Sequence, residues 1–221
     1  MGRMIYVSCG GSMLDDAFRF PGLAEELGLG ERKLYIRDLK QPAATGWLRR
    51  VVAEGRVGEV FDPAWWSLEQ RGHMSAELAM LYFLNRSEPL GADDVIQLIL
   101  ADDEKIIGEI LTAVLEHSVP WERECPRVRP LVVPGLNAEK AGEFAGALRT
   151  LGTMLVDSLG RQDPVLCICG GFKGTVAAML LSARYLQGKD EAVRAYYVHE
   201  RSRELIRLPL EHGEDFTSIS T

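Results

Sequence analysis

The chain has 221 residues, of which 47% are hydrophobic and 26% are charged, and its formal net charge at pH 7 is −7. This length suits one large domain or a domain with an appendage, and the composition is that of an ordinary soluble globular protein. The negative charge argues against broad binding to duplex DNA or RNA, which requires a basic face. No apolar run reaches the roughly 20 residues that span a bilayer, and the first residues lead directly into a predicted strand rather than a secretory signal. We therefore expect a cytoplasmic protein without a membrane partner.

Strands and helices alternate along most of the chain. Strand signals are found at residues 3–9, 94–101, 128–133, 165–169 and 192–199, with a short final element at 207–210. Helical signals are found at residues 45–54, 75–84, 104–117, 138–159 and 176–186. This alternation predicts an α/β fold of Rossmann-like type, which is a mostly parallel sheet with right-handed crossovers and helices on both faces.

Residues 15–72 are less regular and are interpreted as an insertion after the first strand. They contain a possible short strand at 33–37 and the pair Trp65-Trp66. Exposed indoles can stack on bases, but such a pair more often fills a core or a subunit contact. We expect a single domain over residues 1–212, including the insertion at about 15–72, and a flexible tail at 213–221.

Two glycine-rich turns follow predicted strands. The first is Gly10-Gly11-Ser12-Met13, and the second is Gly170-Gly171-Phe172-Lys173-Gly174-Thr175. Glycine lets the backbone bend sharply and lets a ligand approach closely, and the carboxyl ends of parallel strands gather along one edge of a sheet. Lys173 adds positive charge at a helix N-terminus, which attracts anions, and Thr175 is predicted to cap that helix. The turns therefore predict a phosphate-facing site, although such turns are also packing devices and a lysine there is also an ordinary surface residue.

Other motifs argue against several classes of enzyme. The P-loop pattern, the G-x-G-x-x-G pattern of dinucleotide-binding oxidoreductases and the G-x-S-x-G elbow of α/β-hydrolases are all absent. The histidines and cysteines lack metal-ligand spacing, so we expect no metal, no cofactor and buried reduced thiols. One of Asp102 and Asp103 is interpreted as a helix cap. The R-x-x-x-x-H signature of helical ribonucleases occurs at Arg194–His199 and Arg207–His212, but in a predicted strand and around a proline, so neither is interpreted as a nuclease site.

Four motifs together resemble the CARF family, the CRISPR-associated Rossmann-like domains. They are Cys9–Leu14, Ser75–Ala79, Gly170–Gly174, and Tyr196–Glu200 with Leu208–Leu210. The resemblance is nearest to the stand-alone members and the ring nucleases of type III CRISPR systems. It covers most of residues 1–14 and 74–210 and does not account for 15–72.

The resemblance implies a homodimer that binds a cyclic oligoadenylate, most often cyclic tetra-adenylate, across its two-fold axis. Ser12 matches the serine of the family's Gly-Thr-Ser motif, although Gly11 departs from the threonine, and Lys173 matches the lysine after Gly-Gly-Phe. In similar ring nucleases a ribose 2′-OH attacks the adjacent phosphate without a metal and leaves a 2′,3′-cyclic phosphate. Lys173 and Ser12 are then the implied catalytic residues, and the residues of both turns are the implied ligand contacts. A sensor that binds the ring without cutting it remains the alternative, and the ring size and the role of the insertion stay open.

Overall fold

The computed structural model describes residues 2–9, 18, 20, 22–30, 36–39, 41–69, 74–159, 163–169, 173–187, 193–199, 204–208, 210 and 217–219. Within them, a seven-stranded sheet has the order β3-β2-β1-β4-β5-β6-β7. The strands are β1 (Arg3–Ser8), β2 (Val95–Ala101), β3 (Arg127–Val133), β4 (Asp163–Ile168), β5 (Arg194–Val198), β6 (Leu205–Arg207) and β7 (Thr217–Ile219). Neighbouring strands from β3 to β5 are parallel, and β6 and β7 are added antiparallel. The prediction of a Rossmann-like, mostly parallel α/β fold is confirmed.

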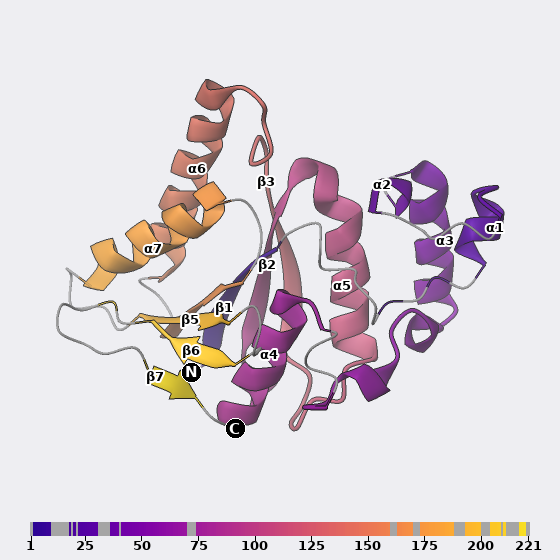
Figure 1. Cartoon of the computed structure of the whole chain (residues 1–221), viewed down its shortest axis with the longest axis horizontal. Helices are drawn as coiled ribbons and strands as arrows, with labels where there is room; N and C mark the ends of the chain where they lie inside the picture. Colours follow the sequence, from indigo (N-terminus) through magenta and orange to yellow (C-terminus); the bar gives the residue numbers. More distant parts are fainter. Residues whose placement is uncertain are drawn as a thin grey trace.

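Helices cover both faces of the sheet, as predicted (Figure 1). One face carries α4 (Ala76–Ser87) and α5 (Lys105–His117), and the other carries α6 (Ala141–Leu159) and α7 (Lys173–Gln187). Each face has its own hydrophobic cluster, and successive residues of one strand alternate between them. In β1, Ile5 and Val7 lie in the cluster shared with α4 and α5, and Tyr6 lies in the cluster shared with α6 and α7. This alternation follows from the two-residue period of a strand and explains why the central strands are apolar on both faces.

The edge strand of the parallel part is β3. Pro130 lies within it, paired in register with Leu98 of β2. Proline cannot donate a ladder hydrogen bond, so it is confined to strand edges, strand starts and bulges. The place of β3 at the edge of the sheet therefore accommodates Pro130.

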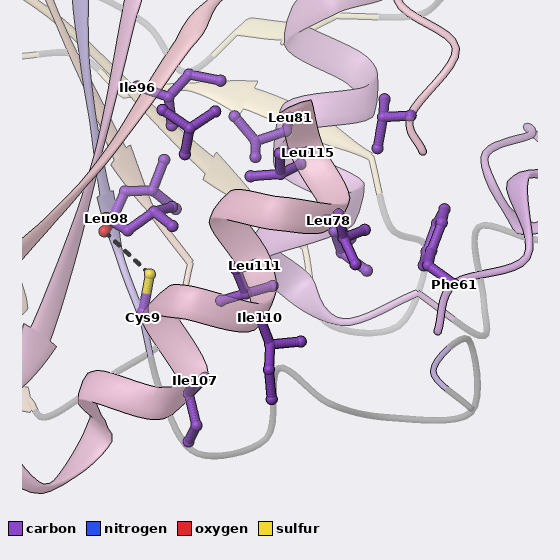
Figure 2. Close-up of a cluster of buried hydrophobic side chains, with 14 of the residues drawn as sticks. Cys9, Phe61, Leu78, Leu81, Ile96, Leu98, Ile107, Ile110, Leu111 and Leu115 are labelled. Atoms are coloured by element: carbon purple, nitrogen blue, oxygen red, sulfur yellow. Dashed lines mark hydrogen bonds between the residues drawn. The ribbon is translucent and has the colours of Figure 1, made fainter. Parts of the chain in front are cut away.

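The described part of the insertion consists of short helices that pack outside α5. They are α1 (Leu23–Glu26), α2 (Ile36–Leu39), α3 (Pro42–Ala53), η2 (Val57–Glu59) and η3 (Pro63–Trp65). In Figure 1 they lie beyond α5, on the side of the molecule away from α6 and α7. Figure 2 shows Phe61 of this segment beside Leu78 of α4, at the margin of the α4–α5 cluster.

Two expectations about the insertion can be compared with its described residues. The prediction of a short strand at 33–37 is wrong for residues 36 and 37, because Ile36 begins α2. Positions 33–35 lie outside the described residues. Trp66 is buried and makes edge-to-face contacts with Tyr82 and Trp121, at centroid distances of 5.5 Å each. Trp66 therefore serves the core rather than an exposed stacking surface.

The starts of α4 and α5 are specified differently. Ser75 caps α4, because its hydroxyl accepts a hydrogen bond of 3.2 Å from the amide of Leu78. The predicted cap on α5 is wrong, since a 3-10 turn, η5 (Asp102–Glu104), precedes that helix. Within this turn the Glu104 carboxylate accepts from the amide of Ala101 at 3.1 Å. Three consecutive acidic residues made the choice between them ambiguous from the sequence.

Arg3 is the hub of an ion network at the amino edge of the sheet. Its guanidinium donates to both carboxylate oxygens of Asp94, at 3.1 and 2.7 Å. It also donates to the Glu88 carboxylate at 3.2 Å and to the carbonyls of Glu88 and Pro89 at 3.0 and 2.9 Å. The Arg3 and Asp94 side chains are only 16% and 8% exposed, so this pair is partly removed from water.

The same network reaches β5 through Glu88. Its carboxylate accepts from the Arg194 guanidinium and, at 3.0 Å, from the Tyr196 hydroxyl. Burial alone would raise the pKa of Glu88, but the bonds and charges of Arg194, Tyr196 and Arg3 outweigh it and hold the pKa below its usual value. Burial also opposes ionisation of Asp94, and bonds from Arg3 and from the Gly91 amide again lower its pKa. The network joins the starts of β1, β2 and β5.

None of the helices in the described part of the chain combines the length and the apolar composition that a membrane crossing requires.

Candidate functional site

The candidate site lies at the carboxyl ends of β1 and β4, which are adjacent strands at the centre of the sheet. The connection between β1 and β2 includes α4, on one face of the sheet, whereas β4 is followed by α7, on the other face (Figure 1). Such a change of direction is a topological switch point, where an open α/β sheet forms a crevice that binds ligands. The two predicted glycine turns follow these two strands directly, after Cys9 and after Cys169.

A buried hydroxyl ties the two strand ends together. Ser8 is fully buried, and its Oγ donates to the carbonyl of Cys167 at 3.3 Å. The same oxygen accepts from the amide of Cys169 at 3.3 Å. The Cys169 thiol lies 3.7 Å from the Ser8 carbonyl oxygen. The starting points of the two turns are therefore fixed relative to each other, although they are far apart in sequence.

Most of the predicted site residues lie outside the described residues. These are Gly10, Gly11, Ser12, Met13, Gly170, Gly171 and Phe172. The backbone of Lys173 is described as the first residue of α7, and Gly174 and Thr175 are described in full. The site is thus located by the strand ends and the helix that flank it.

Among the helices that cover the two faces of the sheet, α7 has the least acidic N-terminus. The first turn of α7 contains no acidic residue and begins with Lys173. By contrast, Glu77 lies in the first turn of α4, Glu143 lies in the first turn of α6, and η5 places three acidic residues directly before α5. A helix N-terminus carries a partial positive charge, which nearby carboxylates offset. Among these helices, α7 is therefore the best placed to receive an external anion.

Gly174 allows α7 to lie close against α6. A Cβ atom at this position would be 2.3 Å from Cζ of Phe144 and 3.0 Å from Cδ1 of Leu148. Both distances are shorter than a normal carbon–carbon contact. The glycine is therefore required for helix packing as well as being part of the predicted turn, and this packing sets the position of the start of α7.

Thr175 does not cap α7, so that prediction is wrong. It is the third residue of the helix, is 1% exposed, and its hydroxyl has no hydrogen-bond partner. Thr175 lies one turn before the fully buried Met179, on the side of α7 that faces the sheet. A buried hydroxyl without a partner is costly. At 1% exposure this hydroxyl does not reach solvent, so its cost falls on the packing of α7 against the sheet.

Two cysteines beside the site, Cys9 and Cys167, are not activated nucleophiles. Burial, with the nearby charges of Glu77 and Glu104, raises the pKa of the Cys9 thiol well above its usual value. Burial also raises the pKa of Cys167. Both thiols are therefore neutral at physiological pH, and the neutral thiol is a poor nucleophile. Cys9 donates to the carbonyl of Val7 at 3.4 Å (Figure 2). Among the described residues, no group of three or more His, Cys, Asp and Glu side chains is arranged to hold a metal ion.

His199 lies at the same edge of the sheet, and the sequence reasoning did not assign it to the site. It follows β5, whose Tyr197 is in register with Ile168 of β4, and its side chain is exposed. Its backbone amide donates to the carbonyl of Glu204 at 2.9 Å. The available signal was positional, because His199 directly follows an apolar strand, as both glycine turns do. Arg194 is the first residue of β5 and His199 directly follows its last, so the helical context of the ribonuclease signature is absent here, as expected.

Comparison with protein-family models matches residues 72–211 to the family described as CRISPR-associated protein (Cas_APE2256). The matched region is more than half of the chain. It runs from just before α4 to just after β6 and includes the second glycine turn. It leaves out β1 and the insertion. No curated protein matches the chain.

Proposed function

Because the chain belongs to the CRISPR-associated Cas_APE2256 family, we propose that it binds a cyclic oligoadenylate across a homodimer and cleaves the ring, which would switch off type III CRISPR signalling. The observation that carries this proposal is the pairing of β1 with β4 at the switch point. It brings together the strand ends that precede both motifs of the CARF resemblance, residues 9–14 and 170–174.

The described groups at this edge suit a phosphate. The N-terminus of α7 offers backbone N–H groups without an intrahelical partner, its first turn contains no acidic residue, and its first residue is Lys173. Together they favour an anion at one place in a chain whose net charge is −7. A small multiply charged ring bound at this place is consistent with the negative overall charge, whereas a long duplex is not.

Cleavage requires positioning, charge stabilisation and two proton transfers. The ribose 2′-oxygen forms a bond to phosphorus and loses its proton, while the bond from phosphorus to the 5′-oxygen breaks and that oxygen gains a proton. Lys173 would neutralise the charge that develops on the phosphate, and Ser12 with the backbone N–H groups of the turns would hold the in-line arrangement. His199 is the described imidazole at this edge, and we assign it as the candidate proton donor to the leaving oxygen.

The surface of α7 supports the proposed dimer. Leu181 and Tyr185 are one helical turn apart and are 71% and 53% exposed. They border a groove of about 380 Å³ between α6 and α7, which Val156 also lines. Large exposed apolar side chains beside a groove favour a subunit contact. A two-fold contact near α7 would present two copies of the site to a ligand of repeated nucleotides.

The test is to incubate the protein with labelled cyclic tetra-adenylate in EDTA and to separate ring from linear product on a gel. Linear product ending in a 2′,3′-cyclic phosphate is expected, and Lys173→Ala should reduce its rate by at least about a hundredfold, as when a main transition-state donor is removed. Lys105→Ala is the matched control, since Lys105 is likewise the first residue of a main helix.

Three other results would change the conclusion. Unchanged turnover in Lys173→Ala would remove the lysine from the mechanism. Tight binding with an intact ring would identify a sensor instead of an enzyme. Absence of both binding and cleavage for rings of three, four and six adenylates would refute the proposed function.

A further inference from the structure

At the place where the candidate crevice begins, the side chain of Ser8 makes the hydrogen bonds that join the end of β1 to the end of β4. The register of β1 with β4 ends at Val7 opposite Cys167, whereas its register with β2 continues to Ser8 opposite Ile99. On the β2 side the backbone bonding extends further still, because the amide of Cys9 donates to the carbonyl of Ile99 at 3.1 Å. Beyond Val7, therefore, β1 remains a regular neighbour of β2 but is joined to β4 through a side chain.

The hydroxyl makes this link in both directions. It donates to the carbonyl of Cys167 and accepts from the amide of Cys169, at 3.3 Å each. One rotatable group thus satisfies a carbonyl of β4 and the amide of the residue that follows β4, and these two bonds together with complete burial hold it in one orientation.

The link lies at the roots of both turns. Ser8 is two residues before Gly10, and Cys169 is one residue before Gly170. Tyr6 belongs to the cluster on the α6–α7 face, and by strand alternation Ser8 points to that face, from which α7 approaches the crevice. A shift of this hydroxyl would therefore move the start of one turn relative to the other.

We infer that Ser8 is a positioning residue of the proposed site, which sets the spacing of the two glycine turns without touching the ligand. This inference rests on the proposed function, since it assigns Ser8 to the geometry of ring cleavage. Ser8 is fully buried and does not reach solvent, so its effect must pass through the backbone it holds. Loss of the hydroxyl should therefore impair the reaction geometry more than it weakens ligand binding.

The experiment compares Ser8→Ala, Ser8→Thr and the wild type in single-turnover cleavage and in equilibrium binding of cyclic tetra-adenylate. A misplacement of about 1 Å can cost on the order of a hundredfold in rate, so we expect Ser8→Ala to lose about that factor in rate and less than about threefold in affinity. Ser8→Thr, which keeps the hydroxyl, should restore most of the rate. If the added methyl group prevents folding, Ser8→Cys is the substitute, because it preserves size and a weak donor.

Ser87→Ala is the control for the general loss of a serine hydroxyl. The Ser87 hydroxyl donates to the carbonyl of Leu84 at 3.2 Å, at the C-terminal end of α4. This variant should retain full cleavage and binding when folded. Folded Ser8→Ala that cleaves at the wild-type rate would overturn the inference, and so would an equal loss of rate and affinity, which would indicate direct contact.

A measurement without ligand separates this inference from the proposed function. In wild-type protein the Cys169 amide should be protected from hydrogen exchange, and Ser8→Ala should lose that protection while the threonine variant keeps it. If wild-type protein neither binds nor cleaves the ring, the proposed function fails and the role of Ser8 in ring cleavage fails with it, whatever the exchange result. If the amide exchanges equally in all variants while cleavage is intact, the strand link itself is refuted.

Discussion

Removal of the Arg3 side chain should cost more stability than any exposed ion pair of this protein can. The Arg3 guanidinium makes five hydrogen bonds, two of them to a carboxylate that is 8% exposed. Breaking a buried pair by deleting one partner typically costs about 3–5 kcal/mol, because the other charge stays buried. Asp94 keeps two backbone donors, the amides of Arg3 and Gly91 at 2.8 and 2.9 Å. The expected loss for Arg3→Ala is therefore at the lower end, about 3 kcal/mol.

The assay is urea denaturation at pH 7, followed by the fluorescence of the four tryptophans. With a slope of about 2–3 kcal/mol per molar, as expected for a large single domain, the midpoint should fall by about 1–1.5 M. Arg3→Lys should recover part of the loss, because one ammonium group cannot reproduce the bidentate contact. Arg86→Ala is the matched control: its ion pair with Glu122 is 54% and 38% exposed, and such pairs contribute at most about 1 kcal/mol. A loss in Arg3→Ala no larger than in this control, at an unchanged slope, would refute the reasoning.

The remaining predictions concern acid stability, helix packing and the unpartnered hydroxyl. The folded-state pKa values of Asp94 and Glu88 are lowered, so the stability that these two carboxylates contribute is complete above their unfolded pKa values and is lost as pH falls through the folded ones. The urea midpoint of the wild type should therefore fall between pH 6 and pH 3, and the midpoint of Arg3→Ala should fall less steeply over the same range. Gly174→Ala should lower the free energy of unfolding by about 1–3 kcal/mol, because overpacking against Phe144 outweighs the better helix propensity of alanine; an increased melting temperature would contradict this. Thr175→Val should raise the free energy of unfolding by about 1 kcal/mol, since it removes a buried hydroxyl without a partner; an unchanged or lower urea midpoint would contradict this.

The fold could be predicted from local patterns because those patterns agree along most of the chain. Apolar runs such as residues 165–169 can be buried only between two layers of helices, and the strand–helix alternation fixes their parallel direction. The order of the strands does not follow from these patterns. That β4 lies beside β1 depends on packing between distant segments, and it is this placement that brings the two turns to one crevice.

Several features of the candidate site depend on tertiary contacts that the sequence does not reveal. Thr175 has the residue type and position of a cap, yet the helix begins two residues earlier and its hydroxyl is left buried. Ser8 appears in the sequence as one residue of an ordinary strand, and its bridging role exists only because β4 is its neighbour. His199 was set aside as part of an improbable ribonuclease motif, while its position after a parallel strand places it at the relevant edge.

The composition of β3 limits how copies of this protein can associate. Arg127 and Arg129 are exposed on this strand, and Pro130 between its two halves cannot donate to a further strand. Charged residues and proline protect an open strand from pairing with another chain, which is the usual first step of aggregation. On this side, therefore, a continuous intermolecular sheet is blocked, and a second subunit has to dock on helices.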